Sequence, residues 1–413
     1  MSHKWGYDAL NKLSKAALAH TIEQARLWGC TWVMDNVHIP RRVFESRLGM
    51  AEKYTAGTAM MAIILPAGEK EFLSRTDLHR QRIDGSKECF DTLRLAIPPP
   101  IEKLPHQFFV HHILSTLLHH LSFAKYEHRD SQLLVPPKPI NTVPSRKSNV
   151  RMLPTVKINE GSHSGMDDVF TEFIKTLEIK SSEERMERLA REDVVGVVGD
   201  GLSYMLALGN YKVHAEDANG VERQDFALHS FGILHTLMAV ANSLHSQYYG
   251  TPTGHGLCRD FQILQRKGLA TQKTKGPFFN QLNEAIHHIL SAHLLDCWLE
   301  ASPNDISDIE DLVDYSPLQL VELAEKILKG YTSTEAMVTA GDDEVFRNAV
   351  MFNRDALVYV EFVAATKAGD VGRFLHLLPA LTARFLGGGN GTYSKIFLEF
   401  NQCLEREWST DTK

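Results

Sequence analysis

Residues 193–203 read DVVGVVGDGLS, and this short stretch decides the fold more than any other. Four of the five residues from 194 to 198 are valines, and such a β-branched run predicts a strand buried on both faces of a sheet. The run ends at Gly199 and Asp200, where a turn or a helix can begin. The sequence therefore predicts a buried strand that ends in an acidic side chain.

A second acidic side chain ends an earlier apolar run, residues 30–36, which read CTWVMDN. Apolar residues at helical spacing predict a helix over residues 7–28, and Gly29 ends it. The strand that follows closes on Asp35 and Asn36. Residues 57–67 form another apolar run, so the early chain reads helix, strand, loop, strand.

The hydrophobic pattern predicts an α-rich α/β fold whose core is interrupted by helical segments. Residues 135–165 lack periodicity and are rich in Pro, Ser, Asn and Lys, which is typical of a linker or a long surface loop. The predicted division is 1–66 for an N-terminal helix and the first core strands, 67–134 for a helical insertion, 135–165 for the linker, 166–250 for core strands with flanking helices, 251–345 for a second helical insertion and 346–413 for the C-terminal helices of the core.

Composition places the chain among ordinary globular proteins. It has 413 residues, 43% of them hydrophobic and 23% charged. No apolar run approaches the roughly 18 residues of a membrane span, and the N-terminus lacks the apolar core of a signal peptide. Five widely spaced cysteines without a CxxC pair fit reduced thiols better than disulfides or a cysteine zinc cluster. We therefore expect an intracellular protein, cytoplasmic or nuclear, with no membrane partner.

The net charge of −7 argues against a protein that simply coats nucleic acid, but it does not exclude an enzyme that acts on nucleic acid. One local basic stretch could hold a phosphate backbone, and its alternative interpretation is a solvated loop. The candidate DNA-binding residues in this stretch are Arg259, Arg266, Lys267, Lys273 and Lys275.

The two strand-ending aspartates suggest a metal site. If their strands are neighbours, Asp35 and Asp200 could share Mg²⁺ or Mn²⁺, which prefer oxygen ligands. Glu361, in a strongly apolar helical stretch, is the favoured third acid, because a buried carboxylate is costly unless it is paired or metal-bound. The alternative is that each aspartate is a turn residue, since Asp is common after strands. The spacing alone does not show that the two strands are adjacent.

Twenty histidines offer a rival metal site. His112 and His119 could share one helix face, but the chain has no HExxH pattern and no flanking acid in register. His235, which closes FGILH, is expected to be a packed or hydrogen-bonded residue.

Residues 353–400, from NRDALVYVEF to KIFLEF, resemble a segment of DUF6589, a transposon-related family of unknown function from mushroom-forming fungi. VVGVVGDGLS, FGILHTLMAV and FFNQLNEAIHHILSAHLLDCW resemble its strand with Gly-Asp, its strand-to-helix segment and the following helix. WVMDNVHIPRRVFESRLG with TAGTAMMAII resembles its early Asp-Asn segment less specifically. The resemblance spans most of residues 29–408.

The resemblance implies an RNase H-like mixed sheet interrupted by large helical insertions, with transposase ancestry. In that superfamily the first strand, the fourth strand and a late helix each give one acid, which implies Asp35, Asp200 and Glu361 as catalytic, metal-binding residues. Where the family has Gln and Leu-Thr after its Gly-Asp, this chain has Gly201, Leu202 and Ser203. Family members are often longer at both ends, so a truncated copy without a DNA-recognition domain is also expected.

Three functional interpretations remain at this point. The first is a two-metal polynucleotide-processing protein, a nuclease or DNA strand transferase if active, with Mg or Mn as cofactor. The second is a non-catalytic, domesticated binding or interaction protein on the same scaffold. The third is a helical interaction protein without nuclease ancestry, which the sheet topology should distinguish from the other two.

Overall fold

The computed structural model describes residues 3–41, 53–72, 75–85, 87, 106–265, 269 and 279–408. The chain forms two compact units. Unit 1 comprises Met1–Phe90, Ser145–Gly232 and Lys395–Lys413, and unit 2 comprises Asp91–Pro144 and Ile233–Ser394. Many helices and one mixed sheet confirm the predicted α/β class.

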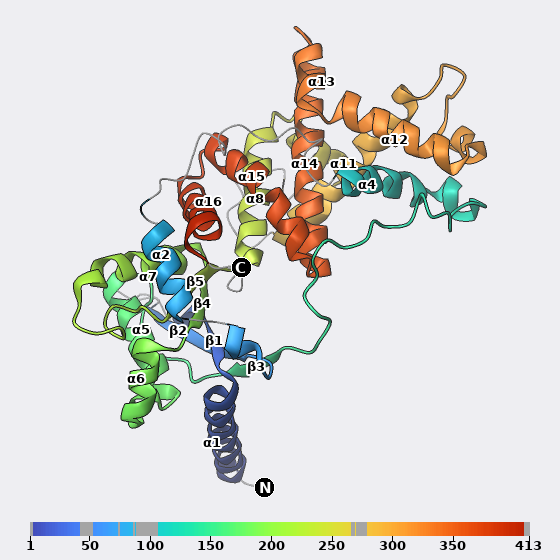
Figure 1. Ribbon diagram of the computed structural model, residues 1–413. Coiled ribbons are helices and arrows are strands. Elements are labelled where there is room, and N and C mark those ends of the chain that lie inside the picture. Colours follow the sequence, from blue (N-terminus) through green and yellow to red (C-terminus); the bar gives the residue numbers. More distant parts are fainter. Residues whose placement is uncertain are drawn as a thin grey trace, which may run out of the picture. The chain divides into compact units, whose positions relative to one another are not determined.

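Unit 1 is built on a five-stranded sheet in the order β3-β2-β1-β4-β5 (Figure 1). The strands are β1 (Cys30–Arg41), β2 (Lys53–Ile64), β3 (Asn149–Met152), β4 (Val195–Gly199) and β5 (Ala227–Phe231). β2 pairs antiparallel with both β1 and β3, whereas β1, β4 and β5 run parallel to one another. The first and fourth strands of the chain are therefore direct neighbours.

One face of this sheet carries the core of unit 1. The Trp32 ring stacks on Phe173 at 4.9 Å between centroids and meets Phe226 edge-on. Phe173 belongs to α5 (His163–Thr176), whose apolar stripe lies on this face. Aromatic rings of this size bury large areas and dominate core energetics, so the contact fixes α5 against β1.

The valine run predicts that β4 is buried on both faces of the sheet, but only one face of β4 is fully buried. Its residues alternate between buried and half-buried, with Val195 and Val197 in the core and Val198 on the less covered face. A continuous β-branched run therefore sits here in a sheet with one tightly packed face. Both sorts of strand favour β-branched residues, so the run alone does not separate them.

The remaining elements of unit 1 surround the sheet. The buried Arg75 side chain donates to the Leu189 and Ala190 carbonyls and pairs with Asp225 at 3.1 Å. These elements are α1 (His3–Trp28), η1 (Glu69–Phe72), α2 (Arg75–Gly85), η4 (Ile179–Ser181), α6 (Glu183–Arg191), α7 (Gly201–Val213), η5 (His214–Glu216), the end of α16 (Gly391–Gln402) and the π-helical turn η7 (Cys403–Glu407).

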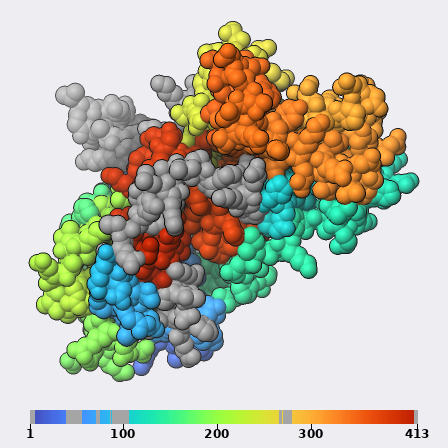
Figure 2. Space-filling model, turned by 45° about the horizontal axis from the view of Figure 1, so that its top comes forward, coloured from blue at the N-terminus to red at the C-terminus, as the bar shows by residue number. Residues whose placement is uncertain are grey.

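Unit 2 is helical in its described part, and α14 (Glu344–Ala368) is its central helix. α14 packs against helices from both segments of the unit, and its buried side chains include Tyr359 and Phe362. Figure 2 shows the surface of α12 joined to that of the segment that contains α4. The other elements are α4 (His106–Leu118), η3 (Leu121–Lys125), α8 (Ile233–Tyr248), α9 (Leu257–Ile263), α11 (Phe279–Ala301), η6 (Ile309–Asp314), α12 (Pro317–Tyr331), α13 (Thr334–Thr339) and α15 (Val371–Gly387).

Residues 135–165, where the sequence predicts a linker or long loop, include β3 and the beginning of α5. β3 has only four residues and pairs with β2 alone, and so short an edge strand leaves little periodicity to read. None of the described helices combines the length and apolar character needed to cross a bilayer.

Candidate functional site

Asp35 and Asp200 lie on adjacent parallel strands. Trp32 pairs with Val197 and Val33 with Val198, so the same register carried two residues further places Asp35 opposite Asp200. Asp200 directly follows the end of β4, as predicted, but Asp35 lies inside β1, which continues to Arg41 instead of ending there. Both residues lie at the edge of the sheet where β4 ends. The prediction that the two strands are neighbours is confirmed.

Asp200 is held in place as the N-cap of α7. Its Oδ1 accepts a hydrogen bond of 2.8 Å from the Ser203 backbone N–H, which satisfies one of the free donors at the helix start. Gly199 makes this tight strand-to-helix turn possible, because a Cβ there would lie 2.6 Å from the Ser203 Cβ. Asp200 therefore has a structural role that needs no metal.

A third carboxylate, Glu160, reaches this edge from the loop before α5. It is fully buried, and the Ser203 hydroxyl lies 2.8 Å from its Oε1 and 2.9 Å from Asp200 Oδ1. Burial, and then the negative charges of Asp200 and Asp35, raise the pKa of Glu160 to about 7, although the Ser203 hydrogen bond opposes the shift. The acids near this edge are thus Asp35, Glu160 and Asp200.

The Ser203 hydroxyl connects two of these acids but has a single hydrogen to donate. It cannot donate to Glu160 and Asp200 at the same time. A proton on Glu160 resolves the conflict, because the carboxylic acid can donate to the Ser203 oxygen while Ser203 donates to Asp200. The geometry therefore agrees with the raised pKa of Glu160.

Two buried acceptor oxygens at this edge have no hydrogen-bond partner among the described residues, Glu160 Oε2 and Asn36 Oδ1. The Thr58 hydroxyl donates to the Ile158 carbonyl, yet it lies near enough to Glu160 to favour the ionised carboxylate. Asn36 pairs with Thr58 across β1 and β2, so these two side chains share the core face of the sheet, whereas the neighbouring Asp35 points to the opposite face. Unpaired buried acceptors need a donor or a cation.

This all-oxygen donor set suits Mg²⁺ or Mn²⁺ in kind. As they are placed, however, no three His, Cys, Asp or Glu side chains of the described chain form a group that could hold a metal ion. Like charges repel without a cation between them, so the carboxylates would have to close around an ion when it binds.

Glu361, the third acid of the sequence hypothesis, belongs to unit 2 and is fully buried in α14. Its carboxylate accepts from Arg373 through Nε at 2.6 Å and through a second guanidinium nitrogen, and His112 Nε2 lies 2.7 Å from it. Arg373 in turn lies over the Phe108 ring. These contacts neutralise Glu361 inside unit 2, as a buried charge requires.

The candidate DNA-binding stretch is described only in part. Arg259 is exposed on α9, whereas Arg266, Lys267, Lys273 and Lys275 lie outside the described residues. His119, of the rival histidine site, lies 2.6 Å from the Ser115 carbonyl through Nδ1, and His112 contacts Glu361. His112 is thus half-buried beside Glu361, whereas His119 is exposed and contacts its own helix.

Glu160 is the residue that sequence reasoning missed. It lies in a stretch without periodicity and follows no predicted strand, so no local pattern marks it. Only the pairing of β1 with β4 and the start of α5 at His163 bring it beside Asp200. Glu160 can therefore be recognised as a site residue only from the folded structure.

In a comparison with known protein families, residues 88–413 match the Family of unknown function (DUF6589). The matched range contains Glu160, Asp200 and Glu361 and begins after Asp35. No curated protein and no solved structure matches the chain.

Proposed function

The chain belongs to the Family of unknown function (DUF6589), and from this premise we propose that it is a transposase-derived, RNase H-like protein that processes polynucleotides in fungal cells. One observation carries the proposal. The first and fourth strands are parallel neighbours, and they place Asp35 and Asp200 at one sheet edge beside the buried Glu160.

The strand order supports the RNase H-like part of the proposal. That superfamily takes one acid from its first strand and one from its fourth, which requires these strands to be adjacent. β1 and β4 are adjacent here, and the purely helical interpretation offers no reason for such a sheet.

We propose Glu160, in preference to Glu361, as the third acid of the site. It lies in the same unit as Asp35 and Asp200, and its charge interacts with both. Glu361, which the family resemblance implies, would have to exchange its hydrogen bonds with Arg373 and His112 for a metal. Breaking a buried ion pair costs about 3–5 kcal/mol, so Glu160 is the less expensive ligand.

The residues of this edge could act as follows. Two Mg²⁺ or Mn²⁺ ions, when bound, would activate an attacking water and stabilise the leaving 3′-oxygen of a phosphodiester. Asp35 would hold them from β1, and Asp200 from the turn that follows β4. Glu160 would lose its proton on binding and supply the last negative charge. Separately, we propose that the basic stretch of unit 2 that begins at Arg259 contacts the DNA phosphates, in an interaction that salt weakens.

The second candidate function is a non-catalytic, domesticated binding or interaction protein on the same scaffold. The observation that favours it is that two of the acids are already in use: Asp200 caps α7 and Glu361 is paired with Arg373. In this interpretation Glu160 stays protonated and the edge never binds a metal.

The experiment that separates the two compares Asp200→Asn with Asp343→Asn. Both positions are helix N-caps, since Asp343 accepts from the Phe346 N–H at the start of α14. Asn caps helices as well as Asp, so both variants should keep wild-type stability. Only Asp200→Asn removes a charge from the acidic edge.

We expect Asp200→Asn to lose Mg²⁺ or Mn²⁺ binding by calorimetry and to lose nuclease or strand-transfer activity on labelled DNA. Asp343→Asn should keep both. A wild-type protein that binds neither ion at millimolar concentration would eliminate the catalytic function and leave the non-catalytic scaffold. Equal losses in both variants would show that the effect comes from the helix caps.

A further inference from the structure

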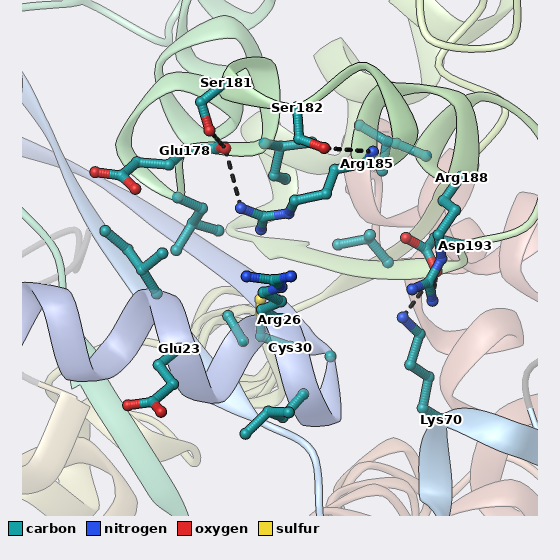
Figure 3. A pocket seen from close by; sticks show the side chains of 18 of the residues that line it. Glu23, Arg26, Cys30, Lys70, Glu178, Ser181, Ser182, Arg185, Arg188 and Asp193 are labelled. Carbon is teal, nitrogen blue, oxygen red and sulfur yellow. Dashed lines mark hydrogen bonds and ion pairs between the residues drawn. The ribbon is translucent and has the colours of Figure 1, made fainter.

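Unit 1 contains a cavity of about 630 Å³ that is separate from the acidic edge (Figure 3). Its walls come from the C-terminal half of α1, the start of β1, the segment from η4 through α6, and the start of β4. Cavities of this size hold small organic ligands. The question is which chemistry its lining would select.

Two guanidinium groups, those of Arg26 and Arg185, face each other across this cavity in Figure 3. Burial and then the charge of Arg26 lower the pKa of Arg185. Arg185 donates to the Glu178 carbonyl at 3.0 Å, but no ion pair within the described chain involves either arginine. Two like charges thus lie close together without a carboxylate between them.

The carboxylates of the lining offset this pair only in part, because the charges of Glu178 and Asp193 raise the pKa of Arg185 by less than burial and Arg26 lower it. Asp193 is 2.8 Å from Lys70 and 3.4 Å from Arg188, so it is engaged by two other cations. Glu23 and Glu178 point away from the guanidinium groups in Figure 3. Glu184 is exposed at the rim.

Helix electrostatics explain one arginine and not the other. Arg26 lies in the last turn of α1, where a cation is favourable. Arg185 is the third residue of α6, at the positive end of the helix dipole, where a cation is unfavourable. Arg185 therefore bears three costs, namely partial burial, the facing Arg26 and the helix end, and an anion in the cavity would offset all three.

We propose that this cavity binds a phosphate monoester of about mononucleotide size, with the phosphate between Arg26 and Arg185. A guanidinium presents a fork of N–H donors that matches phosphate oxygens, and two forks suit a dianion better than a monoanion. Ile22, Leu177 and Ile179 line the same cavity and provide apolar contact for the rest of the ligand. The site does not depend on the acidic edge or on a metal.

The phosphate could belong to a free mononucleotide or to the 5′ end of a nucleic acid chain. Calorimetry on the full chain in EDTA should therefore compare inorganic phosphate, a nucleoside 5′-monophosphate, the matching nucleoside, and an oligonucleotide with and without its 5′-phosphate. We expect the monophosphate to bind at least tenfold more tightly than the nucleoside. Preference for the 5′-phosphorylated oligonucleotide would identify the chain end as the source.

Arg185→Gln and Arg26→Gln should each weaken phosphate binding at least tenfold. Arg191→Gln is the matched control, because Arg191 is also on α6 but 75% exposed and paired with Glu187. Asp200→Asn should bind as wild type, which keeps this test independent of the proposed catalytic function.

Thermal unfolding without ligand provides a second readout. Arg185→Gln removes one of two facing charges, so its melting temperature should equal or exceed that of the wild type. Phosphate should raise the melting temperature of the wild type and of Arg191→Gln, but not that of Arg185→Gln. The proposal is overturned if no phosphate compound binds at millimolar concentration, if the nucleoside binds as well as its monophosphate, or if Arg191→Gln weakens binding as much as Arg185→Gln.

Discussion

Replacing Glu160 by Gln tests the acidic edge most directly. Gln has nearly the shape of Glu, and its amide nitrogen can donate to the Ser203 oxygen as the protonated acid does, over a contact of 2.8 Å in the wild type. It cannot ionise, so the substitution removes the titration and little else. Both the stability of unit 1 and its response to Mg²⁺ should change in a defined direction.

The expected magnitude follows from the pKa of Glu160, which rises from 4.5 to about 7 on folding. Because the folded state holds the proton more tightly, the stabilisation is fully present below pH 4.5 and is lost as the pH rises through 7. Each pKa unit corresponds to about 1.36 kcal/mol, so the wild type should lose on the order of 3 kcal/mol across this window. The Glu160→Gln variant should not lose this stability, so its stability relative to the wild type should rise by the same amount as the pH rises.

Hydrogen exchange in a urea series, between pH 4.5 and 8 in EDTA, can follow peptides from β1 and β4 and so report on unit 1. Glu187→Gln is the control, because Glu187 is 62% exposed and its pair with Arg191 is a weak surface contact. Above pH 7, Mg²⁺ should stabilise the wild type and leave Glu160→Gln unchanged, since only the ionised carboxylate can bind the ion.

A pH-independent difference between Glu160→Gln and the wild type would refute the reasoning. It would mean that Glu160 is ionised throughout and is stabilised by a group outside the acids and hydroxyls described above. A Mg²⁺ response of equal size in both proteins would separately remove Glu160 from the ligand set.

Two further predictions concern buried charge in the two units. Burial lowers the pKa of His229 to about 3. A histidine whose pKa is depressed on folding contributes stability above pH 6.5, and this stability is lost as the pH falls. His229→Leu should therefore move the acid-unfolding midpoint of unit 1 to lower pH. In unit 2, Arg373→Met leaves Glu361 buried without its partner and should lower the free energy of denaturant unfolding by about 3–5 kcal/mol. Adding Glu361→Gln to this variant should restore most of the loss. A double variant as unstable as the single one would show that Arg373 acts through its contact with Phe108 instead.

The two adjacent strands β1 and β4 could be predicted from the sequence because each is marked by a local run of residues. Residues 30–36 and 193–200 are short β-branched or aromatic runs bounded by glycine and aspartate, and they became β1 and β4. β3 could not be predicted, because four residues on a sheet edge carry too little pattern. Its pairing with β2 depends on a contact between residues far apart in the chain.

The candidate site was only partly predictable for the same reason. Asp200 follows the end of its strand as predicted, whereas Asp35 lies inside β1, because the apolar run up to Met34 does not show that the strand continues to Arg41. That the two strands are adjacent was a hypothesis that the parallel register confirms. Glu361 was marked by its apolar surroundings, but a buried carboxylate can be satisfied by arginine as well as by a metal, and here Arg373 supplies that charge. Glu160 carries no local mark, and only its burial beside Ser203 reveals it.

The catalytic and non-catalytic interpretations differ in what neutralises Glu160. A proton on Glu160 satisfies Ser203 and Asp200 together, so the edge is stable at neutral pH without any metal. A cation can replace that proton only if it also draws in Asp35, which is exposed, and binds Glu160 Oε2, which has no hydrogen-bond partner among the described residues. That oxygen gains nothing from the proton that Glu160 shares with Ser203. It is therefore the feature that a purely structural interpretation leaves unexplained, and the reason to look for a metal at this edge first.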